Sequence, residues 1–153
     1  MDIKLRILRF NPETDRKGHW EEYNIEADPD ERILDLLHKV KWFDDGSLAF
    51  RRSCAHGVCG SCAMNMNGKN GLACTKSHSE LDGDIDIYPL PHLKVLKDLI
   101  GDLSTLYKQY ESVEPWLKTT KINDKENIQT KEDRAKLDGL YECIMCALSL
   151  IHI

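Results

Sequence analysis

Four of the six cysteines in this 153-residue chain lie close together, in the stretch RRSCAHGVCGSCAMNMNGKNGLACT. Cys54, Cys59 and Cys62 are separated by four and two residues, and Cys74 follows after eleven more. This C-x4-C-x2-C…C spacing is that of a plant-type 2Fe-2S site. Because cysteine thiolates are the ligands of such clusters, we expect these four sulfurs to hold one.

Most of the residues between Cys54 and Cys62 are small, and two of them are glycines. Gly57 and Gly60 can adopt positive φ angles without strain, so the loop can wrap closely and turn its backbone N–H groups toward the sulfurs. Arg51 and Arg52 precede the loop, where they either offset part of the negative charge of a cluster or simply face solvent. His56 is not expected to be a ligand, because four sulfurs already complete the site.

Two other uses of the cysteines stay open at this point. Four thiolates also make a tetrahedral zinc site, so a zinc-stabilised binding module without a redox role is one alternative. Zinc sites usually take their ligands as two separated pairs, whereas three of these cysteines fall on one glycine-bearing loop, which favours the cluster. A redox-active pair formed by Cys59 and Cys62 is the other alternative, although no βαβ pattern precedes it.

Charge and composition exclude several classes of function. The formal net charge is −5 and the basic residues are scattered, which argues against binding to nucleic acid. The N-terminal residues MDIKLRILRF alternate as a strand does and do not resemble a targeting segment, so we expect a cytoplasmic chain whose cysteines are ligands and not disulfides. The longest apolar stretch, residues 144–153, is shorter than the roughly 18 residues that a membrane span requires.

Hydrophobic periodicity predicts a hairpin and a helix before the cysteine loop. Residues 3–7 and 23–27 alternate between apolar and polar, with a polar turn between them. Asp28-Pro29 with Glu31 is typical of a helix start with a capping box. A helix of about three to four turns is expected to follow, with its apolar residues on one face. These residues are Ile33, Leu36, Leu37 and Val40.

After the loop, short strands are expected at residues 63–67, 72–74 and 84–88, with a turn at Asn67-Gly68. The resulting order of strand, strand, helix and strands indicates an α+β fold, and a small β-grasp sheet fits it.

From residue 93 onward the pattern changes to steps of three and four residues, which predicts a helical second unit. Residues 118–131 are polar and read as a linker or exposed loop. Thr130 and Asp133 are then expected to cap a helix that runs through Leu137 and Tyr141 toward Cys143.

Three stretches, taken in order, resemble the iron-sulfur subunits of succinate dehydrogenases and fumarate reductases: the cysteine loop, IDIYPLPHLKVLKDLIGDLSTLYKQYESVEPWL, and KLDGLYECIMCA. The resemblance runs from residue 1 to about residue 147. It implies a β-grasp 2Fe-2S ferredoxin-like domain over residues 1–100. The start of an all-α, bacterial-ferredoxin-like 4Fe-4S domain would follow over residues 101–153.

The resemblance also implies a set of ligands. The positions that match the four 2Fe-2S ligands of the family are Cys54, Cys59, Cys62 and Cys74. Many succinate dehydrogenases have Asp where Cys62 stands, so this chain carries the all-cysteine version. The positions that match the first two ligands of the 4Fe-4S cluster are Cys143 and Cys146.

The family's chemistry supplies the expected partners. In the full-length proteins, electrons pass from the FAD of a flavoprotein subunit through 2Fe-2S, 4Fe-4S and 3Fe-4S clusters to a quinone at the membrane-anchor subunit. This chain is therefore expected to do no substrate chemistry itself. It is expected to lie on the cytoplasmic side of the bacterial inner membrane, attached through its partners. The small 2Fe-2S subunit of molybdenum hydroxylases has a similar loop and is the alternative, but its second motif is unlike CIMC at residues 143–146.

The resemblance ends at Ser149, where the family has its third 4Fe-4S cysteine. The last six residues, LSLIHI, are also the translation of the transposon-adapter sequence CTGTCTCTTATACACATC. We therefore expect residues 148–153 to be non-native.

Overall fold

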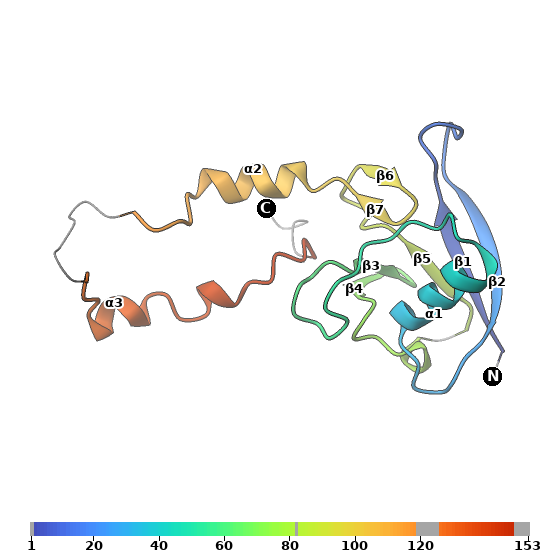
Figure 1. The fold of residues 1–153 in the computed structure, drawn as a ribbon, viewed down its shortest axis with the longest axis horizontal. Helices are drawn as coiled ribbons and strands as arrows, with labels where there is room; N and C mark the ends of the chain where they lie inside the picture. The colour runs from blue at the N-terminus through green and yellow to red at the C-terminus, as the bar shows by residue number, and fades with distance from the viewer. Residues whose placement is uncertain (1, 82, 119–125, 149–153) are drawn as a thin grey trace.

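The computed structural model describes residues 2–81, 83–118 and 126–148. Its first two strands, β1 (Asp2–Arg9) and β2 (His19–Glu26), form an antiparallel hairpin (Figure 1). Leu5 and Ile7 of β1 are fully buried, while the residues between them are half-buried. The predicted hairpin is therefore confirmed, and the apolar alternation of its first strand faces the core.

Three further strands complete the sheet: β3 (Ala63–Met66), β4 (Lys69–Leu72) and β5 (Ile85–Tyr88). The strand order is β2-β1-β5-β3-β4, with β1 and β5 parallel at the centre and the other pairs antiparallel. A mixed sheet of this order with one helix packed on it is a β-grasp, so the predicted α+β class and β-grasp sheet are confirmed. The sequence placed the β4 strand at residues 72–74; it instead ends at Leu72, so Cys74 lies just after it.

The turn between β3 and β4 explains this register. Asn67 and Gly68 both have positive φ, 48° and 82°, as a two-residue hairpin turn requires. Because the turn has only two residues, β4 starts directly after it, at Lys69.

One helix covers the sheet. Helix α1 (Ile33–Lys39) continues into the π-helical turn η1 (Val40–Asp44). The four residues of its predicted apolar face have no exposed surface: Ile33, Leu36, Leu37 and Val40.

The predicted start of this helix was wrong. The Glu31 side chain does accept from the Asp28 amide at 3.1 Å, but the helix begins at Ile33 with an extended Arg32 as its N-cap. Arg32 forms a β-bridge with Ser77, which holds it in the extended conformation and delays the first helical turn. The helix therefore starts four residues later than the predicted first helical position, Pro29, while its apolar face is as predicted.

The chain from residue 93 to residue 101 is not helical, contrary to the prediction. It forms a small hairpin of β6 (Val95–Lys97) and β7 (Ile100–Gly101). Earlier in the chain, the 3-10 turn η2 (His78–Glu80) precedes β5. Asp98 lies at the tip with φ of 43° and is 2% exposed. Its buried carboxylate accepts from the amides of Phe10 and Ala49, and these tertiary bonds override the helical spacing.

Two segments extend away from the sheet (Figure 1). Helix α2 (Ser104–Ser112) leads outward, and helix α3 (Lys131–Ala135) with the 3-10 turn η3 (Leu140–Glu142) leads back. Neither α2 nor α3 has a buried residue. No helix among the described residues is long and apolar enough to cross a membrane.

The predicted last helix is only partly correct. The Thr130 side chain caps α3 by accepting from the Asp133 amide at 3.1 Å, as expected. The helix nevertheless ends at Ala135, and Gly139 adopts a φ of 81° that a continuing helix does not allow. It therefore does not reach Cys143.

A buried arginine joins the hairpin to the β6–β7 unit. The Arg9 side chain is 8% exposed and donates to Asp98 at 3.0 Å, to Glu21 at 2.7 Å, to the Tyr23 hydroxyl at 2.7 Å and to Asp45. Burial alone would lower the pKa of Arg9, but the hydrogen bonds to Asp45 and Asp98 outweigh it and raise that pKa. Arg9 is thus a charged hub that neutralises three carboxylates.

Replacing this hub should be costly. Arg9→Met leaves three carboxylates without their cation, two of them at least partly buried, so we expect a loss of about 3–5 kcal/mol in the free energy of unfolding. Arg6→Met is the matched control, because Arg6 binds Asp86 in a fork at 2.7 Å on a partly exposed face and should cost less than about 1 kcal/mol. Urea denaturation of both variants measures the difference. Equal losses for the two variants would show that the network adds nothing beyond a surface ion pair.

Candidate metal centre

The cysteine loop lies between η1 and β3, at the end of the sheet from which α2 departs. Cys62 and Cys74 are buried, whereas Cys54 and Cys59 are half-buried. The sulfurs lie in two neighbouring pairs. The Cys54 amide donates to Sγ of Cys59 at 3.5 Å and the Cys59 amide donates to Sγ of Cys54 at 3.4 Å, while the Cys74 sulfur is close enough to Cys62 to help raise the pKa of that thiol. No three His, Cys, Asp or Glu side chains in the described part of the chain converge on a single-ion position.

Backbone amides of the loop point at the sulfurs. The Sγ atom of Cys54 accepts from the amides of His56 at 3.5 Å, Val58 at 3.4 Å and Cys59 at 3.4 Å. The Sγ atom of Cys74 accepts from the Gly57 amide at 3.2 Å. The loop is thus folded around sulfur that carries negative charge.

These amides change the acidity of the outer cysteines. The amides of His56, Cys59 and Val58 lower the pKa of Cys54 to about 6. The pKa of Cys59 is also lowered, first by the Cys54 amide and then by Ser61. Cys54 is therefore prepared to act as a thiolate near neutral pH.

The inner pair is in a different environment. Burial raises the pKa of Cys62 to about 11, and the neighbouring Cys74 sulfur adds to the rise. Two buried thiols that share a site lose their protons readily only when a cation is bound between them. Cys62 therefore suits a metal ligand better than a free thiolate.

The backbone of the loop takes conformations that favour glycine. Gly57 and Gly60 have φ of 81° and 71°, and Ala55 has φ of 59°. A side chain at Gly57 would place its Cβ 2.8 Å from the Thr75 side chain. The glycines anticipated from the sequence therefore have the expected use, and Ala55 accepts a left-handed conformation that costs of order 1 kcal/mol or more.

Helix α1 fixes the position of Cys74. The first amides of the helix, those of Ile33 and Leu34, donate to the carbonyls of Lys76 and Ala73, each at 2.9 Å. Amides at a helix start have no partner within the helix, so these carbonyls on either side of Cys74 satisfy them. The segment that carries the fourth sulfur is thereby tied to the most buried part of the core.

One residue of the site was missed from the sequence. Arg32 donates to the Ala55 carbonyl at 2.8 Å and is paired with Asp35 at 2.7 Å. The hydrogen bond to Asp35 raises the pKa of Arg32, and the Cys74 sulfur also contributes. No spacing rule links Arg32 to a loop more than twenty residues away, so only the fold reveals it as the cation next to the sulfurs.

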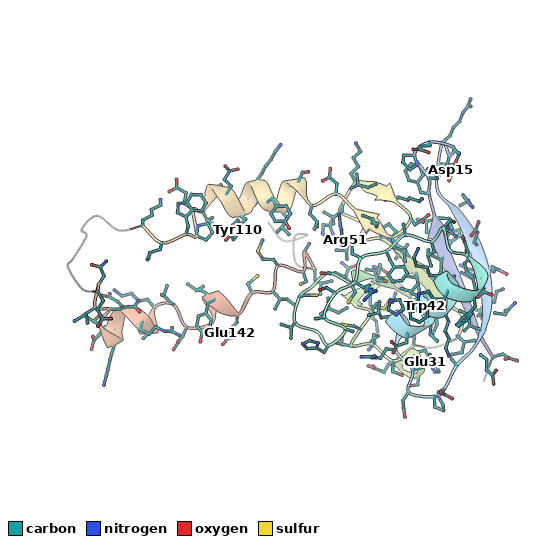
Figure 2. All side chains as sticks on the ribbon, in the orientation of Figure 1. Asp15, Glu31, Trp42, Arg51, Tyr110 and Glu142 are labelled. Carbon is teal, nitrogen blue, oxygen red and sulfur yellow. The ribbon has the colours of Figure 1, made fainter. Side chains whose placement is uncertain are left out.

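The residues that flank the loop have other roles. Arg51 donates to the Gly101 carbonyl at 2.6 Å, and Figure 2 shows it on the side of the sheet unit that faces the two outlying segments. His56 is exposed, with its Nδ1 atom 2.5 Å from the Cys54 carbonyl oxygen, so it turns away from the sulfurs as expected.

The second cysteine pair lies on the returning segment. Cys143 is exposed and Cys146 is half-buried. Met145 and Ala147 have positive φ, 52° and 61°, which is the same kind of backbone as in the first loop. Ser149 lies outside the described residues. The segment borders a cleft of about 270 Å³ whose lining includes Cys59, Gly60, Leu103 and Cys146.

The first loop fits a 2Fe-2S cluster. Its donors are four thiol sulfurs, its amides already point at three of them, and its glycines bring the backbone close. Pairing two and two suits two irons, each held by two thiolates, better than the single tetrahedral centre of a zinc site.

Comparisons with known proteins agree with this geometry. The family model described as "2Fe-2S iron-sulfur cluster binding domain" matches residues 4–108. The mitochondrial succinate dehydrogenase [ubiquinone] iron-sulfur subunit of Dictyostelium discoideum is 49% identical over 152 residues, which cover 95% of this chain and 53% of that protein. The succinate dehydrogenase iron-sulfur subunit of Paracoccus denitrificans is 49% identical over 146 residues, covering 94% and 56%.

A solved structure is similar over nearly the whole chain. It is a chain of the "Mycobacterium smegmatis Sdh1 complex in the apo form", with a TM-score of 0.86 and 28% identity, covering 97% of this chain and 62% of that one. The chain spans about half the length of the curated relatives that it matches. The cysteine loop, the β-grasp sheet and these likenesses together show that the chain belongs to the family of 2Fe-2S cluster-binding iron-sulfur subunits of succinate dehydrogenases.

Proposed function

We propose that this chain is the electron-relaying part of a succinate:quinone oxidoreductase, with no substrate chemistry of its own. Its 2Fe-2S ligands are Cys54, Cys59, Cys62 and Cys74. A 2Fe-2S cluster held there takes up and releases one electron at a time. The protein supplies the four sulfurs, the amides that stabilise their charge, and a buried inner wall that keeps water from one side of the site.

The observation that carries this proposal is the set of amides on the Cys54 and Cys74 sulfurs. Amide hydrogen bonds to ligand sulfurs stabilise the negative charge of a cluster and tune its reduction potential. A structural zinc site transfers no electrons, so it has no reduction potential for such bonds to tune. A reactive dithiol would not engage four cysteines at once. The relatives are named as succinate dehydrogenase subunits, which supports this function over the molybdenum hydroxylase alternative.

The partners follow from the same proposal. Electrons reach the chain from the FAD of a flavoprotein subunit and leave toward a quinone at a membrane-anchor subunit. The chain itself lies peripherally on the cytoplasmic side of the membrane. Val58, 58% exposed within the cluster loop, offers apolar surface beside the outer cysteines for a partner to cover.

A second cluster site is part of the proposal. Cys143 and Cys146 supply two ligands of a 4Fe-4S cluster, in a second unit that follows the β-grasp domain at about residue 100; a 3Fe-4S cluster belongs to the full-length family members. The left-handed residues Met145 and Ala147 support this, because alternation of left- and right-handed backbone turns amides toward one point.

Cluster content tests the proposed function directly. The full chain, purified or reconstituted without oxygen, should be reddish-brown and bleach with dithionite. The reduced sample should give a paramagnetic resonance signal, and iron and acid-labile sulfide should amount to about one 2Fe-2S cluster per chain. A colourless protein with stoichiometric zinc would instead establish the binding-module alternative.

Ligand variants separate the two cysteine pairs. Cys74→Ser removes a buried sulfur that the Gly57 amide contacts, so we expect loss of the visible absorption and of the resonance signal. Cys143→Ser is the matched control, because Cys143 is exposed and outside the first loop, and it should leave both unchanged. Retention of the full signal in Cys74→Ser would refute the ligand assignment.

Arg32 should tune the reduction potential. Arg32→Met removes a cation beside the sulfurs and leaves Asp35 uncompensated, so the reduced cluster is less stable and the midpoint potential becomes more negative. Because the Arg32 side chain is 42% exposed and screened by water, we expect a shift below about 60 mV, the equivalent of tenfold for one electron. Arg6→Met removes a similar arginine–aspartate pair on the sheet and serves as the control in the same redox titration. A positive shift, or an equal shift in both variants, would contradict the assignment.

A further inference from the structure

The second cysteine segment lies directly against the first loop, and Gly60 is the point of contact. A Cβ atom built on Gly60 would lie 2.7 Å from Cα and 2.8 Å from Cβ of Cys146, and 2.9 Å from the Ile144 carbonyl oxygen. Two of these three atoms belong to the backbone, so no side-chain rotation relieves the overlap. The contact therefore exists only because residue 60 has no side chain.

Further contacts hold the same segment. The Ala147 carbonyl accepts from Nε2 of His92 at 2.9 Å, and Ala147 is 7% exposed although it follows the almost fully exposed stretch of α3 and η3. The Nδ1 atom of His92 is buried and has no hydrogen-bond partner among the described residues, so the contact with Ala147 is the one that orients the ring there. Residues 144–147 are thus docked at two points, one on the cluster loop and one on His92.

We propose that Gly60 is a positioning residue: its missing side chain lets Cys146 dock on the cluster loop, and this docking sets the separation between the 2Fe-2S site and the second cysteine pair. The inference rests on the proposed function for the role of that separation, but the docking itself is a property of the polypeptide. Gly60 lies between two of the ligand cysteines, Cys59 and Cys62. An electron that passes from the first cluster site to Cys146 would therefore cross only the backbone contact at Gly60.

Docking also shields the first loop from water. Gly60 and Cys59 line the cleft that the returning segment borders, so removing the segment would expose this side of the loop. Solvent exposure is one of the factors that set the potential of an iron-sulfur cluster, and water stabilises the more highly charged reduced form. Loss of docking should therefore make the midpoint potential less negative.

Alkylation of the free thiols measures docking in the full chain. When the 2Fe-2S cluster is bound, its four ligands are protected, and only Cys143 and Cys146 react with iodoacetamide. In the parent protein, Cys146 should react severalfold more slowly than Cys143, the internal reference. In Gly60→Ala the two rates, read by peptide mass spectrometry, should become similar, and the midpoint potential should rise.

Gly68→Ala controls for strain. Gly68 has a positive φ of 82° like Gly60, but nothing lies within 4 Å of a Cβ built there. This variant should leave the Cys146 rate and the potential as in the parent. An equal change in both variants would show that the effect of Gly60→Ala is backbone strain and not loss of docking.

A double-mutant cycle with His92→Ala tests whether the two contacts act on the same segment. Each single variant should release Cys146, and the double variant should add little to either, because a segment that is already released cannot be released again. If Gly60→Ala fails to bind its cluster, His92→Ala alone decides the docking, since it leaves the loop untouched. A protein that keeps its colour while Cys146 stays slow in both single variants would overturn this inference but leave the proposed function intact, whereas a colourless parent protein would overturn the function.

Discussion

The central constraint on this fold is that backbone N–H groups must turn toward sulfur that carries negative charge. In the loop from Cys54 to Cys62, three amides meet the Cys54 sulfur and one meets that of Cys74. Alternating right- and left-handed residues turn successive amides toward one spot, and the loop uses left-handed residues in this way. The positive φ angles at Ala55, Gly57 and Gly60 are the result. Residue choice in the loop therefore reflects electrostatics together with the close approach of Thr75 to Gly57 and of Cys146 to Gly60.

Such a loop needs a rigid frame, which the β-grasp sheet supplies. The start of α1 binds the carbonyls on both sides of Cys74, and β3 begins directly after Cys62, so two of the four sulfurs are attached to regular structure. The other two sulfurs lie on the free part of the loop, where Arg32 fastens the Ala55 carbonyl. The sulfurs of Cys62 and Cys74 are thus buried against regular structure, whereas those of Cys54 and Cys59 are half-buried on the open side of the loop.

Much of this could be predicted from the sequence, and the failures share a cause. The spacing of the cysteines was enough to predict the cysteine loop, and the alternation of apolar and polar residues was enough to predict the β1–β2 hairpin. Both features depend on residues that are near in sequence. The helix predicted from residue 93 failed because the buried Asp98 carboxylate binds amides at Phe10 and Ala49, far away in the chain. Arg32 at the site and Arg9 in the core were missed for the same reason, since their partners come together only in the folded protein. Local patterns reveal elements and ligand sets, whereas long-range contacts, such as those of Asp98 and the Arg32–Ser77 bridge, determine where some elements begin or stop.

The outlying part of the chain, which includes α2, α3 and η3, is stabilised differently from the sheet. Its apolar side chains are exposed in the described structure, including Tyr107 and Val113 of the α2 region and Leu140 and Tyr141 of η3, so burial contributes little to its stability. Figure 2 shows Tyr110 and Glu142 on two separate arms that do not form a shared core with the sheet. The returning arm is nevertheless anchored at its end, where the Ala147 carbonyl meets His92 and Cys146 meets Gly60. Under the proposed function, this anchoring controls the distance between the two cysteine sites, and the exposed apolar surface of the arms is left for other subunits to cover.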